Sequence, residues 1–292
     1  MINGKLYIIP MPIGNDQDIT LRAISMLQEV DFILAEDTRD AKVILSKYEI
    51  TTPMISYHLH NEKERLDQIT TYLAEGKDLA LISDAGTPLI SDPGYLVVKH
   101  VIDLDFEVIA LPGANAGLTA LVASGLNPER FIFVGFISKK GNERNKQIAN
   151  LRNFPYTFIL YEAPHRIKKT LEELSENDLA DRKITIAREL TKKYETYLYT
   201  DIKGAKEYYQ KKAPRGEFVL VVEGKLDYQN RIENSTEKLV DRSNIENDIK
   251  ELLDGGMKLK SISKYLSKRT DFSKNEIYQL ALNIGQKNIK KL

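Results

Sequence analysis

Five short segments rich in glycine, proline and small polar residues follow apolar runs of the chain, and their residue types suit contact with a ligand. They are Pro12–Asn15, Ser83–Pro88, Pro112–Ala116, Tyr161–Arg166 and Ala187–Glu189. Such residues let main-chain groups approach a planar, polar ligand closely, and a carboxylate such as Asp84 can bind a ribose or an amino group. Taken alone, each segment is also typical of an ordinary turn. Taken as a set, the segments predict a ligand-binding cleft.

Apolar runs before these segments predict the strands that position them. In the first half of the chain, strands are expected at 6–9, 32–35, 79–82 and 107–110. Helices alternate with them, at 21–30, 41–48, 62–75 and 95–102, and either Asp18 or Thr20 can cap the first helix. This alternation predicts a mostly parallel sheet with helices on both faces, whose ligands bind beyond the carboxyl ends of the strands.

The second half of the chain predicts another α/β domain, of mixed strand order. Its expected strands are 131–134, 157–161, 184–187 and 217–222, and its expected helices are 116–124, 141–152, 165–176 and 203–211. The polar segment that follows favours a linker or a partly helical bridge, and three short helices should come after it, the third capped by Ser273. We therefore expect α/β domains at 1–112 and 113–226, a linker at 227–244 and a helix-turn-helix-like tail at 245–292.

Composition excludes several kinds of site. The 42 Lys and Arg residues balance 42 Asp and Glu residues, so attraction to nucleic acid must come from local clusters. Cysteine is absent and the four histidines are scattered, so we expect no disulfide, thiolate nucleophile or metal site. No Gly-x-Gly occurs, which excludes the dinucleotide fingerprint. The N-terminus lacks an export signal and no apolar run has membrane-spanning length, so we expect a cytoplasmic protein.

Eight motifs occur in order between about residues 5 and 225. They are Pro12–Asn15, Asp18–Ala23, Ala35–Arg39, Ser83–Pro88, Ser91–Gly94, Tyr161–Arg166, Ala187–Thr191 and Gly216–Gly224. Together they resemble the ribosomal RNA small subunit methyltransferase I family, which belongs to the tetrapyrrole methylase fold superfamily. The resemblance implies two α/β domains of the tetrapyrrole methylase type, the class III methyltransferases, with a small helical C-terminal domain. Met11 departs from the pattern, because many relatives carry threonine there, and this weakens the case for a hydroxyl contact with the ligand.

The same resemblance implies a homodimeric enzyme that methylates ribosomal RNA with S-adenosyl-L-methionine as its cofactor. The implied target is the 2′-oxygen of a cytidine ribose in the decoding region of 16S rRNA, and no metal is implied. The residues implied to contact the cofactor between the two domains, most of them through backbone atoms, are Pro12, Gly14, Asp84, Gly86, Thr87, Ile90, Asn115, Ala116, Tyr161, Ala187 and Gly216.

Methyl transfer to a ribose oxygen is helped by a general base or a nearby cation, because the hydroxyl is a weak acid. Charged residues at the ends of expected strands are Glu36, Asp37, Glu162, His165 and Arg166. Of these, Glu162, His165 and Arg166 are taken as catalytic, with Glu162 the preferred base and His165 the second choice. Alternatively, Glu162 and Arg166 form a structural ion pair across the start of a helix.

Two basic clusters suit contact with RNA phosphates. From residue 138 to 152, five basic residues stand against one acid, and from 258 to 292 nine stand against two, giving net charges of +4 and +7. The expected RNA contacts are Arg39, Lys139, Lys140, Arg144 and Lys146. The first cluster is also typical of a solvated helix face. The tail could grip RNA or the small ribosomal subunit, and it could equally be a helical cap that stabilises a dimer.

Two other functions stay open. A methyltransferase of the same fold could act on a small tetrapyrrole-like molecule, although the basic clusters and the helical tail argue against this. A non-enzymatic RNA-binding or assembly factor would explain the clusters but would leave the segments at the strand ends unused. The expected partner is 16S rRNA or the small ribosomal subunit, with no membrane.

Overall fold

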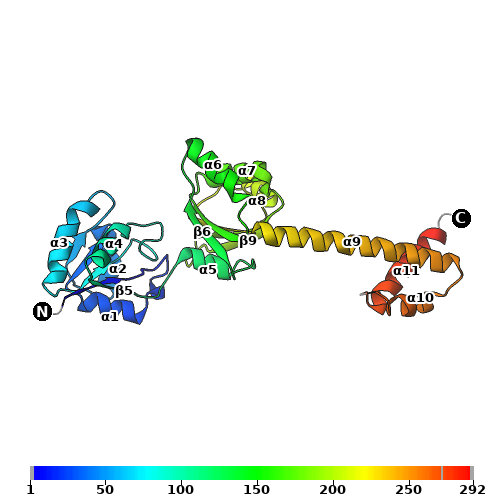
Figure 1. Ribbon diagram of the computed structural model, residues 1–292, viewed down its shortest axis with the longest axis horizontal. Helices are drawn as coiled ribbons and strands as arrows, with labels where there is room; N and C mark the ends of the chain where they lie inside the picture. Colours follow the sequence, from blue (N-terminus) through cyan, green and yellow to red (C-terminus); the bar gives the residue numbers. More distant parts are fainter. Residues whose placement is uncertain (1–2, 271, 290–292) are drawn as a thin grey trace. The chain divides into compact units, whose positions relative to one another are not determined.

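The computed structural model of the chain describes residues 3–270 and 272–289. The chain divides into two compact units, 1–227 and 228–292, and each is described by itself. The first unit contains two five-stranded sheets (Figure 1). Helices pack on both faces of each sheet, so the expected α/β fold class is confirmed.

All strands of the first sheet are parallel, in the order β3-β2-β4-β1-β5. They are β1 (Lys5–Ile8), β2 (Phe32–Ala35), β3 (Met54–Ser56), β4 (Leu79–Leu81) and β5 (Glu107–Ala110). Side chains alternate along β1, so that Leu6 and Ile8 enter one core while Tyr7 enters the other. Because both faces of the sheet are covered, its central strands are continuous apolar runs in the sequence.

Two helices cover each face of this sheet. They are α1 (Leu21–Glu29), α2 (Thr38–Lys47), α3 (Glu62–Ala74) and α4 (Tyr95–Asp103). Leu27 of α1 and Leu45 of α2 belong to one core, and Ile69 of α3 and Val97 of α4 belong to the other. Each helix therefore buries one apolar stripe against the sheet.

Side chains at the helix N-termini fix where the strand-end loops stop. The Thr20 side chain caps α1 by accepting a hydrogen bond from the Ala23 backbone N–H at 3.0 Å, while Asp18 lies in the short 3₁₀ helix η1 (Asp16–Asp18). Of the two expected caps, Thr20 is the one observed. Asp37 caps α2 in the same way, accepting from the Arg39 backbone N–H at 2.8 Å.

The second sheet is mixed, in the order β6-β7-β10-β8-β9. Its strands are β6 (Phe131–Phe136), β7 (Thr157–Glu162), β8 (Lys183–Arg188), β9 (Thr196–Asp201) and β10 (Phe218–Val222). β6 and β7 are parallel, and the other pairs are antiparallel. The expected mixed order is confirmed.

Helices pack unequally on the two faces of the second sheet. They are α5 (Ala116–Val122), α6 (Gly141–Leu151), α7 (Ile167–Leu174), with the π-helical turn η2 (Ser175–Leu179) after it, and α8 (Ile202–Lys211). Residues of α6, α7 and α8 form one core with the sheet, and α5 forms the other (Figure 1). The face under α5 is the one that carries Ile159, Ala187 and Val219.

The sequence did not predict two strands. β3 has only three residues and follows Pro53, so its apolar run is too short to stand out. β9 is an edge strand in which Leu198 is the one aliphatic residue and no residue is fully buried, so its apolar pattern is weak. The expected limits of the two α/β domains stay predictions.

The segment 227–244, expected as a linker, lies within the helix α9 (Lys225–Asp254). Between Gly224 and Gly255 the sequence contains neither glycine nor proline, so no residue interrupts the helix. The first tail helix is therefore the end of a long helix and not a short one.

The second unit is a three-helix cluster. The end of α9 packs with α10 (Leu259–Leu266) and α11 (Lys274–Ile289) around Ile245, Ile249, Ile262, Leu266, Ile277 and Ala281. The Ser273 hydroxyl accepts from the Glu276 backbone N–H at 3.3 Å, and the Glu276 carboxylate accepts from the Ser273 N–H at 2.8 Å. The expected Ser273 cap is thus a capping box. None of the helices over residues 3–270 and 272–289 has the length and apolar composition to cross a membrane.

Candidate active site

A cavity of about 500 Å³ lies at the carboxyl end of β4, between the two sheets of the first unit. Its walls come from the loop after β4, the start of α5, the loop after β7, and the adjoining ends of β8 and β10. The volume is typical of sites that enclose a small organic molecule.

Seven of the residues implied to contact the cofactor line this cavity: Gly86, Thr87, Ile90, Asn115, Ala116, Tyr161 and Ala187. Pro12, Gly14, Asp84 and Gly216 are not among the lining residues. A Cβ on Gly14 would lie 2.5 Å from Lys192, and a Cβ on Gly216 would lie 2.4 Å from Glu189. These two glycines therefore permit close contact between loops, and their role as direct cofactor contacts stays a prediction.

Hydrogen bonds join the loops along one wall of the cavity. Met11 and Gly86 exchange both backbone bonds, at 2.8 and 2.9 Å, and Gly86 has a positive φ of 76° that glycine adopts without strain. The Thr87 hydroxyl donates to the Ala114 carbonyl at 3.0 Å. Segments far apart in sequence are thus fixed to one another.

An aromatic cluster forms one side of the cavity. Tyr161 makes edge-to-face contacts with Phe133 and Phe136, with ring centroids 5.2 and 5.5 Å apart, and its hydroxyl accepts from the Gly117 N–H at 2.9 Å. A register shift between Phe133 and Gly135 brings Phe136 opposite Tyr161. Phe136 was not predicted as a site residue because the expected strand stopped before it. The glycine within that apolar run was the available signal for a bulge.

Glu162 is not free to act as the preferred base. Its side chain is 1% exposed, and both carboxylate oxygens are occupied: Oε1 accepts from Arg166 Nε at 2.7 Å and Ala163 N at 2.8 Å, and Oε2 from Thr170 Oγ1 at 2.5 Å. The structure corrects this assignment, because it has the structural ion pair that the sequence left open. Arg166 also donates to the Ile137 carbonyl, at 3.0 Å, and does not line the cavity.

His165, the second choice of base, lines the cavity from an exposed position on the loop after β7. The loop predicted from the sequence therefore lines the cavity, although two of its three catalytic candidates, Glu162 and Arg166, form an ion pair with each other.

A second group of carboxylates lies at the cavity, after β2 and β4. Asp92 lines the cavity, and Glu36 and Asp84 are close enough for their charges to act on it. Burial, followed by the charges of Glu36 and Asp84, raises the pKa of Asp92 to about 7. Burial and the charge of Asp84 also raise the pKa of Glu36, whereas His58 acts to lower it. Asp92 lies in the motif Ser91–Gly94, for which the sequence indicated no role.

Arg144 was expected to contact RNA phosphates, and the structure corrects this. Its side chain is 2% exposed, donates from Nε to Glu173 at 2.8 Å, and donates from its terminal nitrogens to Thr170 and the Ser138 carbonyl. Lys139, Lys140 and Lys146 are exposed, so these three keep their expected role as a prediction.

Arg39 is also exposed, and it forms an ion pair with Asp37 at 2.6 Å. Within the described residues, no group of three or more histidine and carboxylate side chains is arranged to hold a metal ion.

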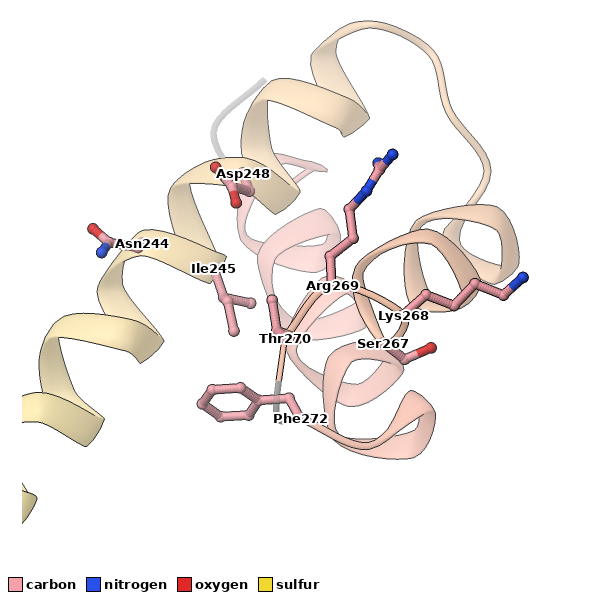
Figure 2. Close-up of a pocket in the computed structure, with 8 residues that line it drawn as sticks. All are labelled: Asn244, Ile245, Asp248, Ser267, Lys268, Arg269, Thr270 and Phe272. Carbon is pink, nitrogen blue, oxygen red and sulfur yellow. The ribbon is translucent and has the colours of Figure 1, made fainter.

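The tail unit has a cavity of its own, between α9 and the segment that joins α10 to α11 (Figure 2). Lys268 and Arg269 contribute positive charge there, and Asp248 contributes negative charge. The Arg269 guanidinium lies 3.8 Å from the centroid of the Tyr265 ring, while Lys268 extends away from α9 in Figure 2. The mixed charge does not by itself identify a ligand, and RNA binding by the tail stays a prediction.

Sequence comparisons connect the whole chain with methyltransferases. The family model of the tetrapyrrole (corrin/porphyrin) methylases matches residues 5–205. Ribosomal RNA small subunit methyltransferase I of Bacillus subtilis (strain 168) is 49% identical over 221 residues, which are 76% of this chain and 75% of the relative. The protein of the same name from Synechocystis sp. is 41% identical over 281 residues, which are 96% of this chain and 98% of the relative.

Solved structures with similar folds are more distant in sequence. Diphthine synthase superposes with a TM-score of 0.59 at 15% identity, covering 76% of this chain and 90% of that one. Uroporphyrin-III C-methyltransferase from Thermus thermophilus, complexed with S-adenyl homocysteine, superposes with a TM-score of 0.52 at 15% identity, covering 77% of this chain and 99% of that one. At these identities the likeness shows the fold.

Proposed function

Because the chain belongs to the ribosomal RNA small subunit methyltransferase I family, within the tetrapyrrole methylases, we propose that it methylates the 2′-oxygen of a cytidine ribose in 16S rRNA, using S-adenosylmethionine. The observation that carries the proposal is the similarity to a relative of that name over nearly the full length of both chains. The target nucleotide is expected in the decoding region of the small ribosomal subunit.

The residues around the cavity fit S-adenosylmethionine. Ile13, Ile90 and Leu190 offer apolar contacts for an adenine ring, and the lining residues within the described part of the chain include neither lysine nor arginine. A cavity without cations suits a sulfonium compound, which is positively charged at its reactive centre. Gly86, Thr87, Asn115, Ala116 and Ala187 would hold the molecule through backbone and short polar groups. When bound, it supplies an activated methyl group.

The protein has to orient the ribose oxygen and exclude water from it. Phe136 and Tyr161 form a packed aromatic side of the cavity, suited to an unstacked base or sugar. Exposed Lys139, Lys140 and Lys146, on the segment after β6 and on α6, together with Arg39, can contact the RNA backbone. A macromolecular substrate needs such contacts outside the cavity.

Two further expectations accompany this proposal. We expect a homodimer, because α5 and β6 leave large apolar side chains exposed to solvent, including Val122 at 80% and Phe131 at 41%. Size-exclusion chromatography with light scattering measures this directly, and a monomer at working concentration contradicts it. A cytoplasmic location follows from the proposed substrate.

The direct test uses small ribosomal subunits from cells that lack this protein. Purified protein and S-adenosylmethionine with a tritiated methyl group should label their 16S rRNA, and mapping of ribose methylation should find one new 2′-O-methylcytidine. Free 16S rRNA and a uroporphyrinogen substrate serve as comparisons. Labelling of the tetrapyrrole and not of RNA would favour the small-molecule alternative, and no labelling of either would overturn the proposal.

A further inference from the structure

Four acidic or basic side chains line the cavity, and three of them are saturated, paired or exposed. Glu162 is saturated by donors from Ala163, Arg166 and Thr170. Glu217 is 79% exposed and pairs with Lys192 at 2.7 Å. His165 is exposed on its loop. The fourth is Asp92, and no residue in the described part of the chain donates a hydrogen bond to it or forms an ion pair with it.

The backbone around Asp92 is held in an unusual conformation. Leu89 and Ser91 have positive φ values of 70° and 71°, which side-chain-bearing residues rarely adopt, and such strain persists only where surrounding structure imposes it. Leu89 packs into the core of the first sheet, and the Gly94 N–H donates to Glu62 at 3.1 Å. The loop is thus fixed on both sides of Asp92.

The second sheet approaches the same loop closely. A Cβ built on Gly135 would lie 3.0 Å from the Ser91 hydroxyl, so the absence of a side chain at the β6 bulge permits this contact. Tyr161 of β7 lines the same cavity as Asp92, and the charge of Asp92 contributes to raising the pKa of Tyr161. Asp92 therefore lies where both sheets border the cavity.

The charges that act on Asp92 are Glu36 at the end of β2 and Asp84 after β4, while His58 acts on Glu36. With acids as its charged neighbours, Asp92 holds a proton more tightly than an ordinary carboxyl does, and its pKa is about 7. Near neutral pH the residue can be charged and still have high proton affinity. This balance is what a general base requires.

We propose that Asp92 is the group that accepts the proton of the ribose 2′-hydroxyl during methyl transfer, an inference that rests on the proposed function. A lone pair of the 2′-oxygen forms the new O–C bond, and the electrons of the broken C–S bond stay on sulfur. The hydroxyl proton goes to a carboxylate oxygen of Asp92. The products are a 2′-O-methylribose, a neutral thioether and a protonated Asp92, which then returns its proton to water.

The central experiment compares single-turnover methylation of small subunits by the wild type, Asp92→Asn and two matched variants. We expect Asp92→Asn to lose about 100-fold or more in rate, as removal of a general base commonly does. Asp103→Asn removes an equivalent charge from an exposed site on α4 and should keep the wild-type rate. His165→Gln tests the rival base. A full rate in Asp92→Asn, or a loss confined to His165→Gln, overturns the inference.

The pH profile separates a base from a structural carboxyl. The wild-type rate should rise about tenfold per pH unit up to a midpoint near 7, where the pKa of Asp92 lies, and then level off. Glu36→Gln removes one of the charges that raise this pKa, so its midpoint should move to lower pH. If Glu36→Gln leaves the midpoint of the pH–rate profile unchanged, Asp92 is not the general base.

A binding measurement gives a readout independent of catalysis. Calorimetry in two buffers of different ionisation enthalpy counts the protons exchanged when S-adenosylmethionine binds. The positive ligand should lower the pKa of Asp92 and release protons near pH 7, whereas Asp92→Asn should bind somewhat more weakly, by reciprocal linkage, and release fewer. Equal release by both proteins contradicts the placement of Asp92. If the wild type itself leaves small-subunit RNA unmodified, the proposed function and the inference fail together, whereas an active Asp92→Asn protein overturns the inference alone.

Discussion

Two carboxylates at the same cavity have opposite surroundings. Glu162 is buried among an arginine, a threonine hydroxyl and a backbone N–H, all of which donate to it. Asp92 is half-buried, and its charged neighbours are acids. Hydrogen-bond donors around a carboxylate satisfy it and stabilise the local structure, whereas neighbouring acids raise the pKa of a carboxyl group. Residues local in sequence saturate Glu162, whereas Glu36, which is distant in sequence, helps to raise the pKa of Asp92.

The donors around Glu162 belong to one continuous hydrogen-bond network. Thr170 donates to Glu162 and accepts from Arg144, and Arg144 pairs in turn with Glu173. Two expected functional residues, Glu162 and Arg144, therefore belong to the same buried structural feature. It fixes the end of β7 against α6 and α7.

The largest expected effect is on folding. Arg144→Met removes a buried cation, leaves Thr170 without its donor and leaves Glu173 with only the 3.7 Å ion pair to Lys169, so it should lower the free energy of unfolding by about 3 kcal/mol. Urea denaturation at pH 7 measures this. Unchanged stability together with weaker, less salt-dependent RNA binding would restore the phosphate-binding role.

Glu162→Gln should cost about 2 kcal/mol of stability, because the amide cannot satisfy all three donors as an acceptor. Once folded, the variant should still show a pH–rate midpoint near 7, because Asp92 is intact. A double-mutant cycle with Arg166→Met measures their coupling. A Glu162→Gln protein that is fully stable but inactive would instead assign the role of general base to Glu162.

Asp92→Asn should stabilise the fold at alkaline pH. In the wild type, the folded-state pKa of about 7 lies above the usual value of 3.8, so the stability that this carboxyl contributes is complete below pH 4 and is lost as the pH rises through 7. Asparagine has no such loss. We expect a gain of about 1 kcal/mol at pH 8, after allowance for partial solvent exposure, and almost none at pH 4. Thermal denaturation at both pH values tests this, with Asp103→Asn as a pH-independent control.

The smallest effect concerns the exposed lysines that share a segment with Arg144. Changing Lys139, Lys140 and Lys146 together to glutamine should leave stability within about 0.5 kcal/mol and weaken small-subunit binding several-fold, because phosphate contacts are individually modest. The dependence of binding on salt should become shallower. An unchanged salt dependence would mean that RNA lies elsewhere on the protein.

Local patterns in the sequence predicted much of the fold. Continuous apolar runs marked the buried strands such as β1 and β10, and Ser273 marked the start of a helix in the tail. Patterns failed where local composition is ambiguous, as in the edge strand β9, which has no fully buried residue, and in the polar segment that is part of α9.

The candidate site was predicted in part for the same reason. Glycine-rich and proline-rich segments at strand ends identified the loops, and seven of the implied residues line the cavity. The ion pair of Glu162 with Arg166 follows from their spacing of four residues, whereas the burial of Asp92 and the charge of Glu36 beside it depend on elements that only the fold brings near. No spacing within the sequence contains that information.

The reciprocal backbone bonds between Met11 and Gly86 have a consequence for substitution. Every residue type except proline carries the N–H that position 11 donates, so a proline there would remove one of the two bonds that hold the loop. The Met11 side chain is 2% exposed and packs in the core of the first sheet, so a change of side chain at this position acts on packing and not on these bonds.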